Sequence, residues 1–224
     1  MKKFVALLLV LSACAADAAV MPINNPGALT IDGTIDWGPL GPPFTQINNP
    51  FTIGVDGCNL SAVVSQAGQS SFERRDQGNG WGGNFGPGEE LLWTAGANGP
   101  MTLAFNSTIS GIGFQIQADF FGAFTATLEA FDSSNMSLGS FMFNGNSTSD
   151  GDDSAIFIGV LSDMSDIASL SIDVSDINGQ SDFAINGPLI QCGAGSVPEG
   201  GATLLLLALG GAAIFALRRS IRMA

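Results

Sequence analysis

The middle of the chain alternates apolar and polar residues with a period of two. The alternation is clearest over residues 112–117, 124–130, 168–174 and 183–186. A period of two places all the apolar side chains of a strand on one face. Two further apolar runs also predict strands, 138–143 and 156–161, and the second is continuously apolar, as in a central strand covered on both faces. The pattern therefore predicts one strand after another, with almost no helix.

Turn-forming residues separate these predicted strands. Asn144-Gly145 and Asn178-Gly179 are the clearest turns, and Asp/Ser-rich segments at 132–135 and 163–166 are two more. Strands this close together are typical of an all-β domain, so we predict an antiparallel β-sandwich or jelly-roll-like fold of about eight to eleven strands. Residues 66–88 are rich in glycine and predict a long loop, with a short strand starting at Trp81.

The first 18 residues predict a secretory signal peptide. Lys2 and Lys3 precede an eight-residue apolar run at 4–11, and Ala16-Asp17-Ala18 offers a cleavage site. The same stretch permits a second interpretation, because residues 11–14 (LSAC) resemble a bacterial lipoprotein box that would lipidate Cys14. Both interpretations direct the chain out of the cytoplasm.

The C-terminal region predicts a single transmembrane helix. Residues 202–217 carry no charge, and the uncharged run from Gly200 would span about 27 Å as a helix, enough for a thin hydrocarbon core. Arg218, Arg219 and Arg222 follow it, and basic residues beside a span favour the cytoplasmic side. The bulk of the chain is then expected outside the inner membrane.

The residues before this span resemble a known sorting signal. Val197, Pro198, Glu199 and Gly200 precede the apolar run and the arginines, an order similar to the VPDSG-like or VPEG-like variants of the PEP-CTERM signal. Gly200-Gly201 stand where other members carry Ser or Gly. The resemblance divides residues 197–224 into a motif (197–201), a transmembrane helix (202–217) and a basic tail (218–224). It implies cleavage near Pro-Glu by an exosortase, a membrane-embedded cysteine protease or transpeptidase of bacteria that produce exopolysaccharide.

The predicted domain, residues 19–196, also resembles the β-sandwich ectodomains of PEP-CTERM proteins. The shared runs lie at 109–117, 157–160 and 182–186, and they imply packing rather than an activity. The domain is strongly acidic, with eighteen Asp and Glu side chains against Arg74 and Arg75, a net charge of −16. This charge excludes nucleic acid as a partner.

The residue inventory predicts that the protein is not an enzyme. The absence of histidine from the whole chain excludes a Ser-His-Asp triad, a Cys-His pair and a His-ligated metal site. Carboxylate pairs could serve a polysaccharide-acting enzyme, but so many acids make some pairing inevitable. We therefore predict no catalytic residue.

Four groups of residues are candidates for sites. Cys58 and Cys192 are expected to pair in an oxidising compartment, the alternative being two separate thiols. Trp81 could stack on a sugar ring or pack in the interior. The other candidates are the paired Arg74 and Arg75, bridged to Glu73 or Asp76 or orienting a partner, and a calcium site or solvated turn formed by Asp150, Asp152 and Asp153.

We therefore expect an exported cell-surface or extracellular-matrix protein. It would be held in the membrane by its C-terminal helix, processed by an exosortase-like enzyme, and serve a structural or adhesive role with exopolysaccharide as a partner. The alternatives are a carbohydrate-binding module with its site on the Trp81 loop and a calcium-dependent adhesive domain. We expect no cofactor, and calcium would be required only by the calcium-dependent adhesive domain.

Overall fold

The computed structural model describes residues 19–193. The predicted signal peptide with Cys14, the sorting motif, the span and the basic tail lie outside the described residues. The described part is all-β, with two short 3-10 helices, and every strand pair is antiparallel except β6 with β7. In chain order the elements are β1 (Val20–Ile23), η1 (Pro26–Ala28), β2 (Gly33–Thr34), η2 (Gly38–Leu40), β3 (Gln46–Asn48), β4 (Phe51–Val55), β5 (Leu60–Gln66), β6 (Ser71–Gln77), β7 (Gly80–Trp81), β8 (Glu90–Trp93), β9 (Met101–Ala118), β10 (Gly122–Phe131), β11 (Ser137–Ser147), β12 (Ile156–Ser162), β13 (Ile167–Asp176), β14 (Gly179–Gln180), β15 (Phe183–Ile185) and β16 (Leu189–Cys192).

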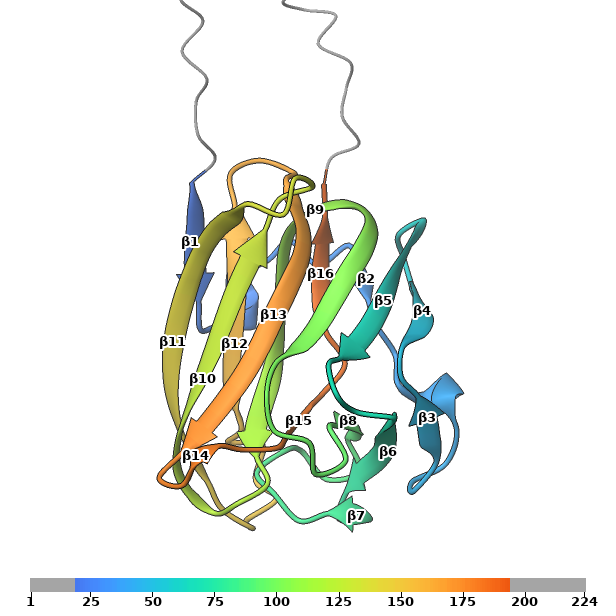
Figure 1. Ribbon diagram of the computed structural model, residues 1–224, viewed down its shortest axis with the longest axis vertical. Coiled ribbons are helices and arrows are strands. Elements are labelled where there is room, and N and C mark those ends of the chain that lie inside the picture. Colours follow the sequence, from blue (N-terminus) through green and yellow to red (C-terminus); the bar gives the residue numbers. More distant parts are fainter. Residues whose placement is uncertain (1–18, 194–224) are drawn as a thin grey trace, which may run out of the picture.

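The strands form two layers in a β-sandwich-like arrangement, and β9 belongs to both (Figure 1). The N-terminal half of β9 pairs with β5 and β13, which continues the first layer through β10 to β11. Its C-terminal half pairs with β12, β16 and β15 in the second layer. The 18-residue strand bends between the halves, where Asn106 and Ser107 are exposed. One strand thus ties the two layers together.

The core between the layers is built by the alternating residues. Met101 and Leu103 from one half of β9 and Ile112, Phe114 and Ile116 from the other are fully buried. The partner strands bury the matching residues of their own patterns, namely Phe124, Ala126, Leu128, Ile158, Val160, Leu170, Ile172 and Val174. The strands predicted from the alternation are therefore confirmed.

Four predictions of detail are wrong. Asn144-Gly145 is not a turn, because both residues lie within β11 and pair with β10. The described residues contain sixteen strands rather than eight to eleven, because several additional strands are only two or three residues long. Residues 66–88 are not one long loop, since β6 and β7 lie within them. Strand β12 is central, between β1 and β9, but Phe157 and Leu161 on its outer face are only half-buried.

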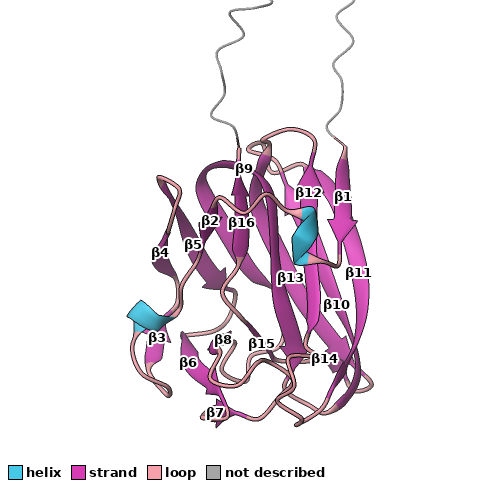
Figure 2. Ribbon diagram, turned by 180° about the vertical axis from the view of Figure 1, so that it is seen from behind, coloured by secondary structure: helices cyan, strands magenta, loops and turns pink. Residues whose placement is uncertain are grey.

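Residues 24–32 cross the outer face of the second layer (Figure 2). The crossing carries the chain from β1, which pairs with β12, to β2, which pairs with β16. Leu29 packs at Gly111 of β9, where a Cβ would approach the leucine Cδ2 to 2.8 Å. The Thr30 N–H donates to Gln191 Oε1 (2.9 Å). This crossing divides the outer face into an upper and a lower part.

The described chain begins and ends at the same end of the sandwich (Figure 1). The Ala19 N–H donates to Asp163 Oδ1 (3.0 Å), and Gly193 lies against Ser165, so both ends contact the turn between β12 and β13. The turns that follow β9 and β13 lie at the opposite end. The large apolar side chains Phe120, Phe121 and Ile177 are exposed there, 61%, 63% and 95% respectively.

Candidate functional site

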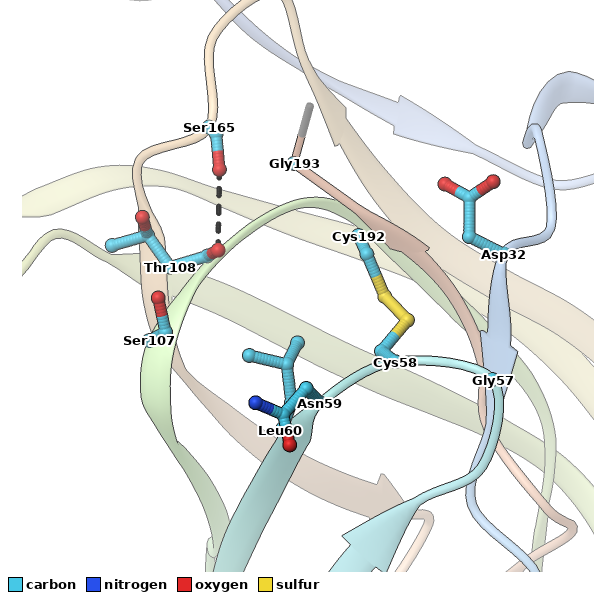
Figure 3. Close-up of a pocket in the computed structure, with 10 residues that line it drawn as sticks. All are labelled: Asp32, Gly57, Cys58, Asn59, Leu60, Ser107, Thr108, Ser165, Cys192 and Gly193. Atoms are coloured by element: carbon cyan, nitrogen blue, oxygen red, sulfur yellow. Dashed lines mark hydrogen bonds between the residues drawn. A yellow bond between two sulfur atoms is a disulfide. The ribbon is translucent and has the colours of Figure 1, made fainter. Parts of the chain in front are cut away.

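The predicted pairing of Cys58 with Cys192 is confirmed, since the two residues form a disulfide (Figure 3). Their Cα atoms lie 6.6 Å apart and they are separated by 134 residues in the chain. A loop of this length gives a stabilisation of about 5 kcal/mol on the chain-entropy model. The bond connects the β4–β5 turn to the end of the last strand, beside the last described residue.

A hollow of about 390 Å³ lies beside this disulfide (Figure 3). Its other walls come from the bend in β9 and from the β12–β13 turn, where the Ser165 hydroxyl donates to the Thr108 carbonyl (3.1 Å). Among residues 19–193, Asp32 is the single charged side chain that lines it.

Trp81 lies in the interior of the described domain. Its side chain is 6% exposed, and its ring centroid lies 6.4 Å from that of Phe85 and 6.5 Å from that of Trp93. The indole N–H donates to Gln117 Oε1 (3.1 Å). Stacking on a sugar requires an open ring face, which this packing does not leave. The geometry therefore favours packing over carbohydrate contact at Trp81.

A buried polar network holds the glycine-rich segment after Trp81 onto β9. Gln117 is 1% exposed, and its Oε1 also accepts the Asn84 N–H (2.7 Å). Gln117 Nε2 donates to Asn84 Oδ1 (2.8 Å) and to Ser147 Oγ (2.6 Å), while Asn84 Nδ2 donates to Ser154 Oγ (2.8 Å). The network satisfies these buried groups with protein partners, so it is a structural element.

The acidic run at 150–153 does not converge on one point. Asp150 accepts from the Thr148 hydroxyl (2.8 Å), Asp152 from the Ser154 hydroxyl (2.5 Å), and Asp153 from Gln115 Nε2 (2.8 Å). The Ser154 hydrogen bond lowers the pKa of Asp152. Within residues 19–193, no three His, Cys, Asp or Glu side chains are grouped so that they could hold a metal ion.

Both arginines are paired with carboxylates, which is one of the two alternatives that the sequence left open. Arg74 is 2% exposed; its guanidinium contacts Asp76 and lies 2.7 Å from Glu90 Oε1. Burial, and then the hydrogen bond with Asp36, raise the pKa of Glu90.

Arg75 is paired with Glu73 (2.7 Å). Its guanidinium also lies over two aromatic rings, 4.6 Å from the centroid of Phe44 and 4.7 Å from that of Trp93. The only two basic side chains of the described domain are therefore both engaged, in ion pairs and in contacts with aromatic rings.

A second hollow, which no pattern in the sequence predicts, lies on the outer face of the second layer, below the crossing of residues 24–32. It has a volume of about 300 Å³. The apolar part of its wall includes the half-buried ring of Phe157, which lies over Gly113, with Pro26 and Leu189 beside it. The polar part is formed by four side chains, Glu89, Gln115, Asp153 and Asn186. We call this the outer hollow.

The two amides of the outer hollow link its two carboxylates. Asn186 Nδ2 donates to Glu89 Oε1 (2.6 Å) and to Gln115 Oε1 (3.0 Å). Gln115 Nε2 donates to Asp153 Oδ1 (2.8 Å). Glu89 Oε2 and Asp153 Oδ1 lie 3.6 and 3.7 Å from the position that a Cβ on Gly86 would take. The two carboxylates therefore lie near each other beside Gly86, and both line the outer hollow.

The described residues, 19–193, contain no helix long and apolar enough to cross a membrane. The fold defines the class of protein, a β-sandwich-like all-β domain with one disulfide.

No family model matches the chain, and no curated protein matches it at a significant level. A DUF4465 family protein from Bacteroides caccae is similar at 12% identity with a TM-score of 0.34, over 77% of this chain and 99% of that one. The structure of infectious bursal disease virus, Gt strain, is similar at 13% identity with a TM-score of 0.21, over 71% of this chain and 40% of that one. These likenesses assign no function.

Proposed function

We propose that this chain is an exported, non-enzymatic protein of the cell surface or extracellular matrix with a structural or adhesive role. Its C-terminal span holds it at the outside of the inner membrane until an exosortase-like enzyme processes it at Val197–Gly200. The observation that carries the proposal is the Cys58–Cys192 disulfide, because such bonds form and persist in oxidising compartments outside the cytoplasm.

The position of the described ends is also in keeping with this proposal. Ala19 and Gly193 both contact the β12–β13 turn, so a membrane anchor after residue 193 would lie at that end of the sandwich. The end with Phe120, Phe121 and Ile177 would then point away from the membrane. The disulfide holds the last strand to the domain at the point where a pull on the anchor would act.

Mass spectrometry of the protein purified from its native host tests the proposal. The expected mature chain starts after Ala18, or at a lipidated Cys14, ends within 197–200 and carries the Cys58–Cys192 cross-link. A double variant, Pro198→Ala with Glu199→Ala, should be exported and oxidised but keep Arg218 and Arg219. An intact chain with Lys2, Lys3 and reduced thiols would overturn the proposal of export.

A further inference from the structure

The outer hollow presents hydrogen-bond acceptors and almost no free donors. Both N–H bonds of the Asn186 amide are used, by Glu89 Oε1 and by Gln115 Oε1. Both N–H bonds of the Gln115 amide are also used, by Asp153 Oδ1 and by the Ala155 carbonyl (3.3 Å). Any ligand that fits here must therefore bring the donors itself.

The free acceptors belong to the two carboxylates. A carboxylate has about four lone-pair sites. Within the described domain, Glu89 Oε2 accepts only the Gly86 N–H (3.1 Å), and no donor contacts Asp153 Oδ2. The hollow is thus lined by two carboxylates that have most of their accepting capacity unspent.

No basic side chain of the described domain neutralises these charges. Arg74 and Arg75 are paired with Asp76, Glu90 and Glu73 instead. An anionic ligand is therefore repelled, and a cationic one is favoured, because charge-assisted hydrogen bonds are about twice as strong as neutral ones.

The apolar part of the hollow selects the shape of the ligand. The Phe157 ring, Pro26 and Leu189 form a ledge beside the carboxylates. A volume of about 300 Å³ is at the small end of the range for ligand sites and leaves room for a single ring. A pyranose has an apolar face that suits such a ledge and hydroxyl donors at its rim.

We propose that the outer hollow binds a pyranose residue that carries a free ammonium group, that is, an amino sugar within a polysaccharide. The ammonium group and neighbouring hydroxyls donate to Glu89 and Asp153, and the apolar sugar face lies against Phe157 and Leu189. The inference rests on the proposed function only for its biological setting, since a matrix protein would encounter such a polysaccharide. The binding itself does not depend on the proposed function.

The test is calorimetric titration of the full-length chain in a polyoxyethylene detergent, which has no sugar headgroup. The probe is a β-1,4-linked glucosamine oligomer, with three comparison ligands: its N-acetylated form, a glucose oligomer and a galacturonate oligomer. We expect about tenfold weaker binding for the two neutral oligomers, since they lose the charged donor, and none for the galacturonate. Putrescine, a cation without a ring, should also bind about tenfold more weakly than the glucosamine oligomer.

A matched pair of variants separates the hollow from the general negative charge of the domain. Asp153 has a φ of 62°, which Asn tolerates well, so Asp153→Asn removes one charge of the hollow without straining the backbone. Asp150→Asn removes the same charge from an exposed carboxylate that does not line the hollow. We expect about tenfold weaker binding for the first variant and less than about twofold for the second.

The proposal is overturned by any of three results. They are equal affinity for the free-amine and N-acetylated oligomers, equal loss in the two variants, and no binding of the glucosamine oligomer at millimolar concentration. An unchanged melting temperature of Asp153→Asn shows that the variant is folded. Because these measurements use purified protein, their failure leaves the proposal of export and processing untouched, and the reverse also holds.

Discussion

Two glutamines on β9 are two residues apart and lie on the same face of the strand, yet their surroundings are opposite. Gln117 is 1% exposed, and protein groups fill its hydrogen-bonding positions on both the oxygen and the nitrogen. Gln115 is half-buried at the rim of the outer hollow, where it holds Asp153 and Asn186 beside an open space. The residue type and the strand are the same, so the difference is whether another segment of the chain lies over the side chain.

The cover over Gln117 is the glycine-rich segment that follows Trp81. Gly83 lies directly over the glutamine. A glycine is needed there because any Cβ at this position would come within 2.1 Å of Gln117 Oε1. This segment does not extend over Gln115, and the acceptors around that residue stay free. A satisfied, covered network stabilises the fold, whereas an open one with unspent acceptors can bind a ligand.

Replacement of Gln117 should have the largest effect on stability. Gln117→Ala removes the partners of the Trp81 indole, the Asn84 N–H and the Ser147 hydroxyl within a buried region. We expect a loss of about 4 kcal/mol in the free energy of unfolding, because each orphaned buried group costs about 1–3 kcal/mol and some will regain water. Urea titration followed by tryptophan fluorescence measures it.

The matched control for this variant is Gln180→Ala, since Gln180 is an exposed glutamine that contacts Asp173 (2.9 Å). It should change stability by less than about 0.5 kcal/mol. A Gln117→Ala variant as stable as this control would show that the network contributes nothing and would remove the comparison.

Replacement of Asn84 should have an intermediate effect. Asn84→Ala removes acceptors from Gln117 and from the Thr148 N–H (2.6 Å), but Thr148 and Ser154 lie near the surface and can bind water instead. We expect a loss of about 2 kcal/mol. Hydrogen exchange provides a local readout, in which the Thr148 amide should lose its protection while the amides at the centre of β9 keep theirs.

The sequence predicts the long strands because their period of two reflects a buried face. It cannot predict the short edge strands, since β7 and β14 have two residues each, too few for any period. Strand β6 was missed because polar residues such as Arg74 occupy its buried positions, where ion pairs replace apolar burial. The disulfide could be proposed from the two cysteines and the expected oxidising compartment, although the sequence does not give the distance between the cysteines.

The outer hollow has no local signal in the sequence. Its polar side chains come from residues 89, 115, 153 and 186, which are brought together by the pairing of β9 with β12 and by the contact of Asn186 with Gln115. Gln115 and Gln117 are both polar residues on the outer face of one strand, and their pattern is identical. Only the tertiary structure shows that a loop covers one and leaves the other open.

The effect of burial on a polar side chain can also be tested by titrating the buried carboxylate of Asp182, which lies near Trp93. Asp182 is 5% exposed; burial raises its pKa, while the Trp93 indole N–H (3.1 Å) acts in the opposite direction. A raised acid pKa contributes stability below the unfolded value, about 3.9, and that contribution is lost as the pH rises through the folded value. Relative to Asp182→Asn, the wild type should therefore become less stable as the pH rises above about 4, as measured by urea titration at each pH. A constant difference between the two proteins would contradict the raised pKa.

The smallest change in stability is expected for Gln115→Ala. Its side chain contacts Asp153, Asn186 and, more weakly, the Ala155 carbonyl (3.3 Å) at an open rim, so water can replace the lost amide. The Gln115 backbone N–H keeps its bond to Asn186 Oδ1 (2.7 Å). The free energy of unfolding should fall by less than about 0.5 kcal/mol. Binding of the glucosamine oligomer should nevertheless weaken, because Gln115 positions one of the two carboxylates. A loss of stability as large as that of Gln117→Ala would mean that both glutamines stabilise the fold and that the hollow is structural. Weaker binding at unchanged stability would show that Gln115, unlike Gln117, serves the binding of a ligand.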